Sequence, residues 1–111
     1  MTAVAASLGS SPALVLPAEL TIYNVGELHP QWLAWFSEVT ASGVEGVAEV
    51  QAGAVELVDA AGLQLLLSLH RALSIHGRRH RITGASNALA AGCAGLGLAD
   101  WLQTHSEEAI A

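Results

Sequence analysis

The sequence predicts an α/β sandwich in which helices cover mainly one face of a mixed β-sheet of about four or five short strands. The first observation is that short apolar stretches alternate along the chain with longer stretches whose apolar residues repeat at helical spacing. The second is that glycine, serine or proline residues separate these stretches, as they do at turns. A chain of 111 residues is long enough to form one domain with its own core.

Composition excludes several classes of protein. With 52% hydrophobic and 13% charged residues, the chain is not intrinsically disordered. The net charge of −6 argues against a nucleic-acid binder. No apolar run reaches the roughly 18 residues that a membrane span needs, and the N-terminus lacks the basic region of a secretory signal. Cys93 is the single cysteine, so no internal disulfide can form, and we expect a cytoplasmic domain without direct membrane insertion.

The first third of the chain predicts a disordered segment followed by two strands. Residues 1–11 are rich in Ala and Ser and show no periodicity. Short strands are expected over residues 13–16 and 19–23, separated by Pro17, which suits a strand edge or a turn.

A helix follows, and its start is ambiguous. Asn24 is a suitable N-cap, but Pro30 lies in the second turn of a helix that begins there. The helix therefore begins either directly after Asn24 or at His29. Trp32 and Trp35 recur at helical spacing, which favours packing in the core over an exposed binding groove.

The long helix has both of its ends marked in the sequence. A strand over residues 44–51 leads toward Asp59, whose carboxylate can accept the backbone N–H of Ala61 or Gly62 and so cap the helix. Gly77 supplies the stop at the other end. One arc of this helix, which docks on the sheet, is formed by Leu65, Leu66, Leu69 and Leu73, with Gly62 beside it.

Two leucines, Leu63 and Leu67, lie outside that arc, on the side of Gln64 and Arg71. Either the protein's own helices cover this side or it is a partner surface, and both interpretations stay open. All four basic side chains lie between Arg71 and Arg81. This window is either a solvated helix exit or a functional patch.

The last third predicts a strand over residues 80–83 and a helix capped by Ser86 or Asn87. The resulting domain spans residues 12–103, and residues 104–111 form a polar tail.

The residue patterns offer little chemistry. The glycines between residues 92 and 97 lack the spacing and the lysine of a nucleotide-binding loop. His76 and His80 have a metal-like spacing, but Gly77 breaks the helix between them and no second ligand pair follows. A buried, inert thiol is expected at Cys93. We therefore expect no catalytic residues, no metal site and no cofactor.

The stretch V-D-A-A-G-L-Q-L-L-L-S-L-H-R-A-L resembles the signature loop and helix of the STAS family, the domain of anti-sigma-factor antagonists and sulfate-transporter tails. The resemblance extends upstream to L-P-A-E-L-T-I-Y-N-V and downstream to R-I-T-G-A-S, and covers roughly Leu14 to Leu102. The upstream phrase most resembles stand-alone STAS proteins associated with chemotaxis signalling. In the family, a loop hydroxyl is phosphorylated by a partner kinase. Here Ala60 and Ala61 stand at these positions, so no phosphorylation is expected at the usual place.

The resemblance implies a non-catalytic protein-interaction module of bacterial signalling, similar to an anti-sigma-factor antagonist. Its partner would be an anti-sigma factor or serine-kinase-like protein, a chemotaxis component or an ATPase, and a homodimer is possible. One alternative is the STAS subunit of a lipid-transport ABC ATPase complex, and another is a sensor of a small ligand or nucleotide. The expected contact surface consists of Asp59, Ala60, Ala61, Gly62, Leu63, Gln64, Leu67 and Arg71.

Overall fold

The computed structural model of the protein describes residues 12–106. The predicted N-terminal segment, residues 1–11, therefore lies outside the described residues, as do residues 107–111 of the predicted tail.

The strands are short and form two parallel sheets. β1 (Leu14–Val15), β3 (Ala48–Gln51) and β5 (His80–Thr83) make a three-stranded sheet in the order β1-β3-β5. β2 (Glu19–Leu20) pairs with β4 (Leu57–Val58) in a second sheet. Every pair is parallel, so the α/β class is confirmed, whereas the prediction of a mixed sheet is wrong for residues 12–106. The reason is that a helix lies between the two strands of every pair and returns the chain in the same direction.

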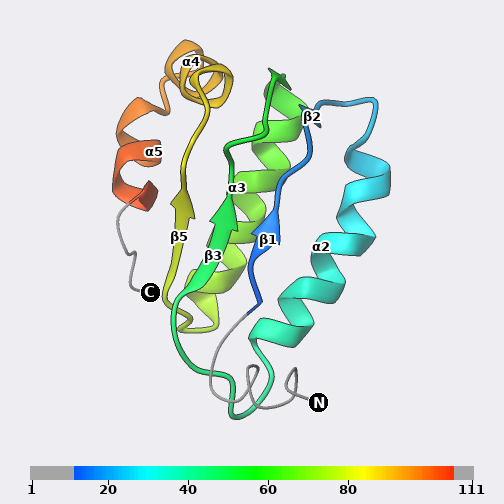
Figure 1. Cartoon of the computed structure of the whole chain (residues 1–111), viewed down its shortest axis with the longest axis vertical. Coiled ribbons are helices and arrows are strands. Elements are labelled where there is room, and N and C mark those ends of the chain that lie inside the picture. The colour runs from blue at the N-terminus through cyan, green and yellow to red at the C-terminus, as the bar shows by residue number, and fades with distance from the viewer. Residues whose placement is uncertain (1–11, 107–111) are drawn as a thin grey trace.

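Four helices cover the strands of the described chain: α2 (Val25–Val39), α3 (Ala60–Ile75), α4 (Asn87–Gly95) and α5 (Ala99–Ser106). α3 runs behind the three-stranded sheet with α2 beside it, and α5 lies alongside β5 (Figure 1). No helix in residues 12–106 is both long enough and apolar enough to cross a membrane.

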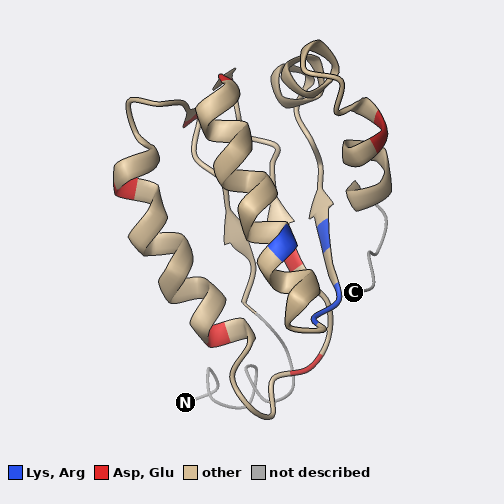
Figure 2. Cartoon of the chain, turned by 180° about the vertical axis from the view of Figure 1, so that it is seen from behind, with Lys and Arg blue, Asp and Glu red and all other residues tan. Residues whose placement is uncertain are grey.

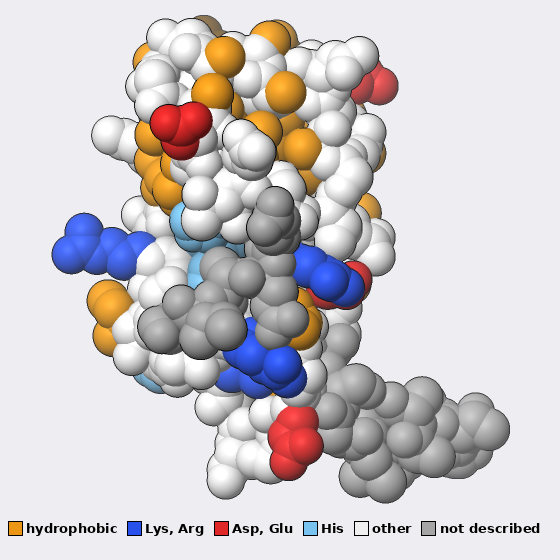
Figure 3. Space-filling view, turned by 90° about the vertical axis from the view of Figure 1, so that its left-hand side faces the viewer, with side chains coloured by type: hydrophobic (Ala, Val, Ile, Leu, Met, Phe, Trp, Pro, Cys, Tyr) orange, Lys and Arg blue, Asp and Glu red, His pale blue; other side chains and the backbone are white. Residues whose placement is uncertain are grey.

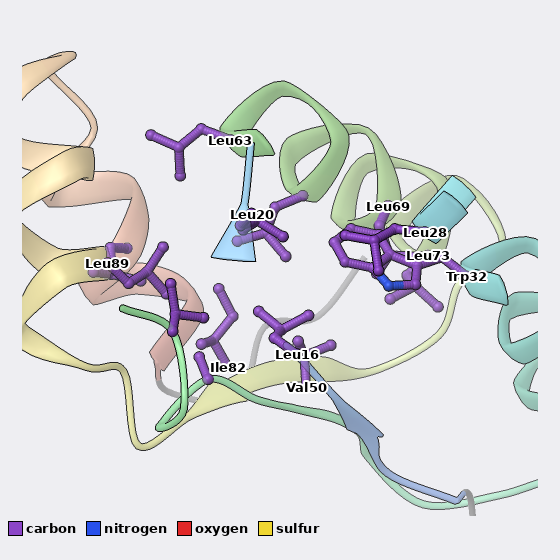
Figure 4. Close-up of a cluster of buried hydrophobic side chains, with 14 of the residues drawn as sticks. Leu16, Leu20, Leu28, Trp32, Val50, Leu63, Leu69, Leu73, Ile82 and Leu89 are labelled. Atoms are coloured by element: carbon purple, nitrogen blue, oxygen red, sulfur yellow. The ribbon is translucent and has the colours of Figure 1, made fainter. Parts of the chain in front are cut away.

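The core lies between the strands and the helices, with buried side chains from α2, α3, α4 and α5 (Figure 4). Trp32 and Trp35 are buried, which confirms the prediction that they pack in the core. The indole Nε1 of Trp35 also donates to the carbonyl of Pro12 over 2.7 Å, so this side chain ties the start of the described chain to α2. Leu16, Leu20, Val50, Leu66, Leu73 and Ile82 are among the other buried side chains.

α2 begins at Val25 and continues through Pro30. Asn24 precedes it, but its side chain does not cap the helix. Instead, its Oδ1 accepts the backbone N–H of Thr21 over 2.9 Å, and its Nδ2 donates to the carbonyl of Glu19. Asn24 therefore closes the turn between β2 and α2.

In the C-terminal part of the described chain, the structure fixes the cap of α4 and the end of α5. The Oγ of Ser86, rather than the side chain of Asn87, accepts the N–H of Leu89 and caps α4. α5 continues to Ser106, past residue 103, where the sequence predicted that the domain ends.

Candidate functional site

Asp59 joins two loops at one end of the molecule. Its Oδ1 accepts the backbone N–H of Gly62 over 3.0 Å, which is the predicted cap of α3. Its Oδ2 accepts the N–H of Ile22 over 3.0 Å, a contact that the sequence did not predict. The bond from Ile22 lowers the pKa of the Asp59 carboxyl the most, and the bond from Gly62 lowers it further. The loop after β4 is thereby held against the loop after β2.

Gly62 allows α3 to approach β2 closely. A Cβ at this position would lie 1.8 Å from the carbonyl oxygen of Leu20. Because that oxygen belongs to the backbone, no side-chain rotation could relieve the overlap. The glycine of the signature loop is therefore required by packing, and it is itself buried.

The two loops present small and apolar side chains to solvent. Ala60 is exposed and Ala61 is half-buried. Beside them, Ile22 is 59% exposed and Tyr23 is 89% exposed. The sequence does not indicate these two residues, because it predicts a strand over residues 19–23, whereas β2 ends at Leu20. The turn-forming Asn24 is the signal that could have identified this loop.

The outer face of α3 carries a shallow hollow of about 290 Å³. Gln64, Leu67 and Arg71 line it together with Ser68. Gln64 and Arg71 are exposed and Leu67 is half-buried. Three of the predicted contact residues therefore share one surface, one turn of α3 beyond the signature loop.

Leu63 does not belong to that surface. Its side chain is only 2% exposed, so the prediction that it shares the outer side with Leu67 is wrong. α4 covers this side of α3, and Gly92 is the residue of α4 that faces it. A Cβ at Gly92 would lie 2.6 Å from Val58 and 3.8 Å from Leu63, so the missing side chain leaves room for both.

Two further hollows flank α3. One, of about 250 Å³, lies between the signature loop and α4 and includes Asp59, Ala60 and the exposed Leu96. The other, of about 210 Å³, is an apolar groove between α2 and α3. Its lining residues are His29, Trp32, Leu33, Phe36, Leu65, Ser68, Leu69 and Ala72.

The arginines do not form a single patch. Arg81 makes an ion pair with Glu49 across the neighbouring strands β5 and β3. Arg71 is exposed on α3. Figure 2 shows basic positions on separate elements, one on α3 and others on β5 and the turn before it. Figure 3 likewise shows the basic side chains at separate places on the side of the molecule near β5. Arg81 therefore has a structural partner within the protein, which argues against its belonging to a functional basic patch.

The cysteine and the two histidines singled out in the sequence differ in their exposure to solvent. Cys93 is fully buried, and burial raises the pKa of its thiol. His76 is exposed at the end of α3, whereas His80 is buried. Within residues 12–106, no group of three His, Cys, Asp or Glu side chains is arranged to hold a metal ion.

Comparison with known proteins agrees with this geometry. A family model described as "Mlab, STAS domain" matches residues 4–104. The crystal structure of a sulfate transporter family protein from Wolinella succinogenes is similar, with a TM-score of 0.63 and 16% identity over 86% of this chain and 72% of that one. At this identity, the likeness shows the fold alone. No curated protein matches the chain significantly. The signature loop, the capped helix α3 and a family match over almost the whole described chain show that this protein belongs to the STAS domain family.

Proposed function

We propose that this STAS domain is a non-catalytic protein-interaction module of bacterial signalling, similar to an anti-sigma-factor antagonist. STAS domains are generally non-catalytic modules. The observation that carries the proposal is the outer face of α3, where Gln64, Leu67 and Arg71 line one hollow next to the signature loop.

The proposed contact surface consists of the loop residues Asp59, Ala60 and Ala61 with Gln64, Leu67 and Arg71. It excludes Leu63, which is core, and it gains Ile22 and Tyr23 from the loop after β2. We call this the loop–α3 surface.

The composition of this surface suits a protein partner. A half-buried leucine between a glutamine and an arginine is an apolar contact with a polar rim, as at the centre of many interfaces. Asp59 holds the two loops together in the free protein. Less conformational freedom is then lost on binding, because part of the surface is already ordered.

The alanines at the loop imply that binding is not switched in the usual way. Neither Ala60 nor Ala61 carries a hydroxyl that could accept phosphate. An added negative charge at this place, next to the carboxylate of Asp59, is expected to repel a partner that sits on the loop. The variant Ala60→Glu should therefore bind more weakly than the natural protein.

Affinity capture from extracts of the native host, with mass spectrometry of the retained proteins, tests the proposal. Leu67→Ser should reduce capture of a specific partner about tenfold or more, because burial of a leucine contributes about 1.5–3 kcal/mol. The melting temperature should change little. Leu33→Ser is the matched control, since Leu33 is 51% exposed but lies on α2, outside the loop–α3 surface. Loss of capture with Leu33→Ser and not with Leu67→Ser would place the interface on the α2–α3 groove instead.

A second candidate is a permanent subunit of a lipid-transport ABC ATPase complex. The paired alanines favour it, because a permanent subunit needs no phosphorylation switch in the loop. Gel filtration of the captured complex distinguishes the two. An ATPase that co-elutes in fixed ratio supports the second candidate, whereas an anti-sigma factor or serine-kinase-like protein supports the first.

A further inference from the structure

Three histidines from three different elements meet on the side of the molecule where α5 packs. His70 comes from α3, His80 from β5 and His105 from α5. The Nδ1 atoms of His70 and His80 are 2.8 Å apart. The ring centroid of His105 lies 5.4 Å from that of His70 and 5.6 Å from that of His80. We call these residues the histidine cluster.

The cluster is mostly closed to water. His70 is 1% exposed and His80 is fully buried, and histidine atoms are visible on this side of the surface (Figure 3). Trp101 of α5 covers the cluster from one side: it stacks on His105 at a centroid distance of 4.5 Å and meets His70 edge to face at 5.7 Å. α5 is thus docked partly through imidazole rings.

The bond between His70 and His80 requires that at least one of these two rings is neutral. Only one of the two facing Nδ1 atoms can carry a proton, since the other must accept it. His80 Nε2 bonds to the Oγ of Ser74 over 2.9 Å, and His105 Nδ1 donates to the carbonyl of Trp101 over 2.8 Å. His70 Nε2 is buried with no hydrogen-bond partner. In a charged His70 this atom would be a donor without an acceptor, which burial makes unfavourable.

Within residues 12–106, no carboxylate is paired with a histidine of the cluster. The burial of His70 and the nearby His80 and His105 lower its pKa to about 3. Burial and His105 lower the pKa of His80 to about 4. Of the charged groups on the elements packed here, Glu49 of β3 pairs with Arg81 of β5, and Asp100 lies exposed in the first turn of α5. The remaining ones are Arg71 of α3 and, in the turn before β5, Arg78 and Arg79.

We propose that the histidine cluster is an acid-sensitive latch, whose protonation releases α5 from α3 and β5 before the rest of the domain unfolds. A released imidazole takes up its proton near pH 6.5, well above the pH at which the buried one does so. The docked state is therefore fully favoured above about pH 6.5, and this advantage is lost as the pH falls toward 4 and 3. α5 leaves first because it has only eight residues and Leu102 is its one buried side chain.

Fluorine NMR of the full chain labelled with 5-fluorotryptophan tests the latch. The three tryptophans report on two regions, since Trp32 and Trp35 lie in α2 and Trp101 lies in α5. As the pH is lowered from about 7.5 to about 4.5, the fluorine chemical shift of Trp101 should change to that of a solvent-exposed tryptophan before the signals of Trp32 and Trp35 change. A simultaneous change of all three signals would show global unfolding and would overturn the proposal.

Variants identify the titrating groups. The double change His70→Leu with His80→Leu replaces both partners of the buried bond by apolar side chains, which a core tolerates. It should remove the pH dependence of the Trp101 signal, whereas the exposed His76→Gln should leave it intact. A release of α5 that persists in the double variant excludes His70 and His80 as its cause and overturns the latch.

Two measurements on the natural protein apply even where the double variant fails to fold. Proton NMR titration should show the rings of His70 and His80 neutral as long as Trp101 stays docked. Titration of either ring near pH 6.5 with α5 in place overturns the latch. A rise in melting temperature with added Zn²⁺ also overturns it, since the rings would then meet around a cation.

Discussion

Asp59 illustrates how one side chain serves both local and long-range structure. A helix N-cap requires one acceptor oxygen, and Oδ1 supplies it to Gly62. The second oxygen binds the N–H of Ile22, 37 residues away in the sequence. An asparagine would retain only one of these acceptors, because its amide nitrogen cannot accept a hydrogen bond.

The Asp59 series therefore has an expected order. Asp59→Asn should lower the melting temperature and Asp59→Ala should lower it further, because the first loses one hydrogen bond and the second loses both. Thermal unfolding followed by circular dichroism measures this. The pKa of Asp59 is lowered in the folded state, so its contribution is present above pH 3.8 and is lost as the pH falls through the lowered value. A melting temperature for Asn equal to that of Asp would show that the bond to Ile22 contributes nothing.

The two glycines Gly62 and Gly26 should respond in opposite directions to alanine. Gly62→Ala forces a Cβ against the carbonyl of Leu20 and should cost about 1–3 kcal/mol or more as α3 is pushed from β2. Gly26 lies in α2 with nothing near its missing Cβ, so Gly26→Ala should stabilise by about 0.4–1 kcal/mol. Denaturant unfolding of both variants is the measurement. A neutral Gly62→Ala would mean that α3 can shift freely on β2.

At the scale of elements, the apolar periodicity of α3 predicted the helix and the side that packs on the sheet, but not which other helices cover it. Leu66, Leu69 and Leu73 are buried, as their helical spacing predicted, while Leu65 is only half-buried at the α2–α3 groove. Leu63 is buried against α4, which no pattern within α3 itself could indicate.

Two leucines one turn apart on α3 should therefore behave differently. Leu63→Ala opens a cavity in the core and should cost about 2–5 kcal/mol of folding free energy. Leu67→Ala removes a half-buried side chain that lines the outer hollow, so its effect on unfolding should be much smaller. Urea denaturation of the two variants compares them directly. Equal losses would mean that Leu67 is also held within the core.

For the whole molecule, α5 extends the described fold past the predicted domain boundary. The predicted boundary at residue 103 cuts α5, which runs from Ala99 to Ser106. A chain ending at residue 103 loses His105, which stacks on Trp101 and bonds to its carbonyl. Its melting temperature should be lower than that of a chain ending at residue 106, by calorimetry at neutral pH. Identical values would show that the last turn of α5 adds no stability.

The sequence by itself determined the features that depend on neighbouring residues. The cap at Asp59, the stop at Gly77 with its φ of 71°, and the bounds of β5 were all predicted and are confirmed. Each depends on contacts within a few positions of the chain or on the conformational freedom of one glycine. The burial of Trp32 and Trp35 also follows from a repeat within one helix.

Only the tertiary structure decided the features that join distant segments. The parallel pairing of the strands, the bond from Ile22 to Asp59 and the cover of α4 over Leu63 each bring together segments far apart in sequence. The histidine cluster joins three elements in the same way, and its members carry no common spacing in the sequence. Local signals act over one or two helical turns, whereas the choice of packing partner is made by the shape and burial of the whole chain.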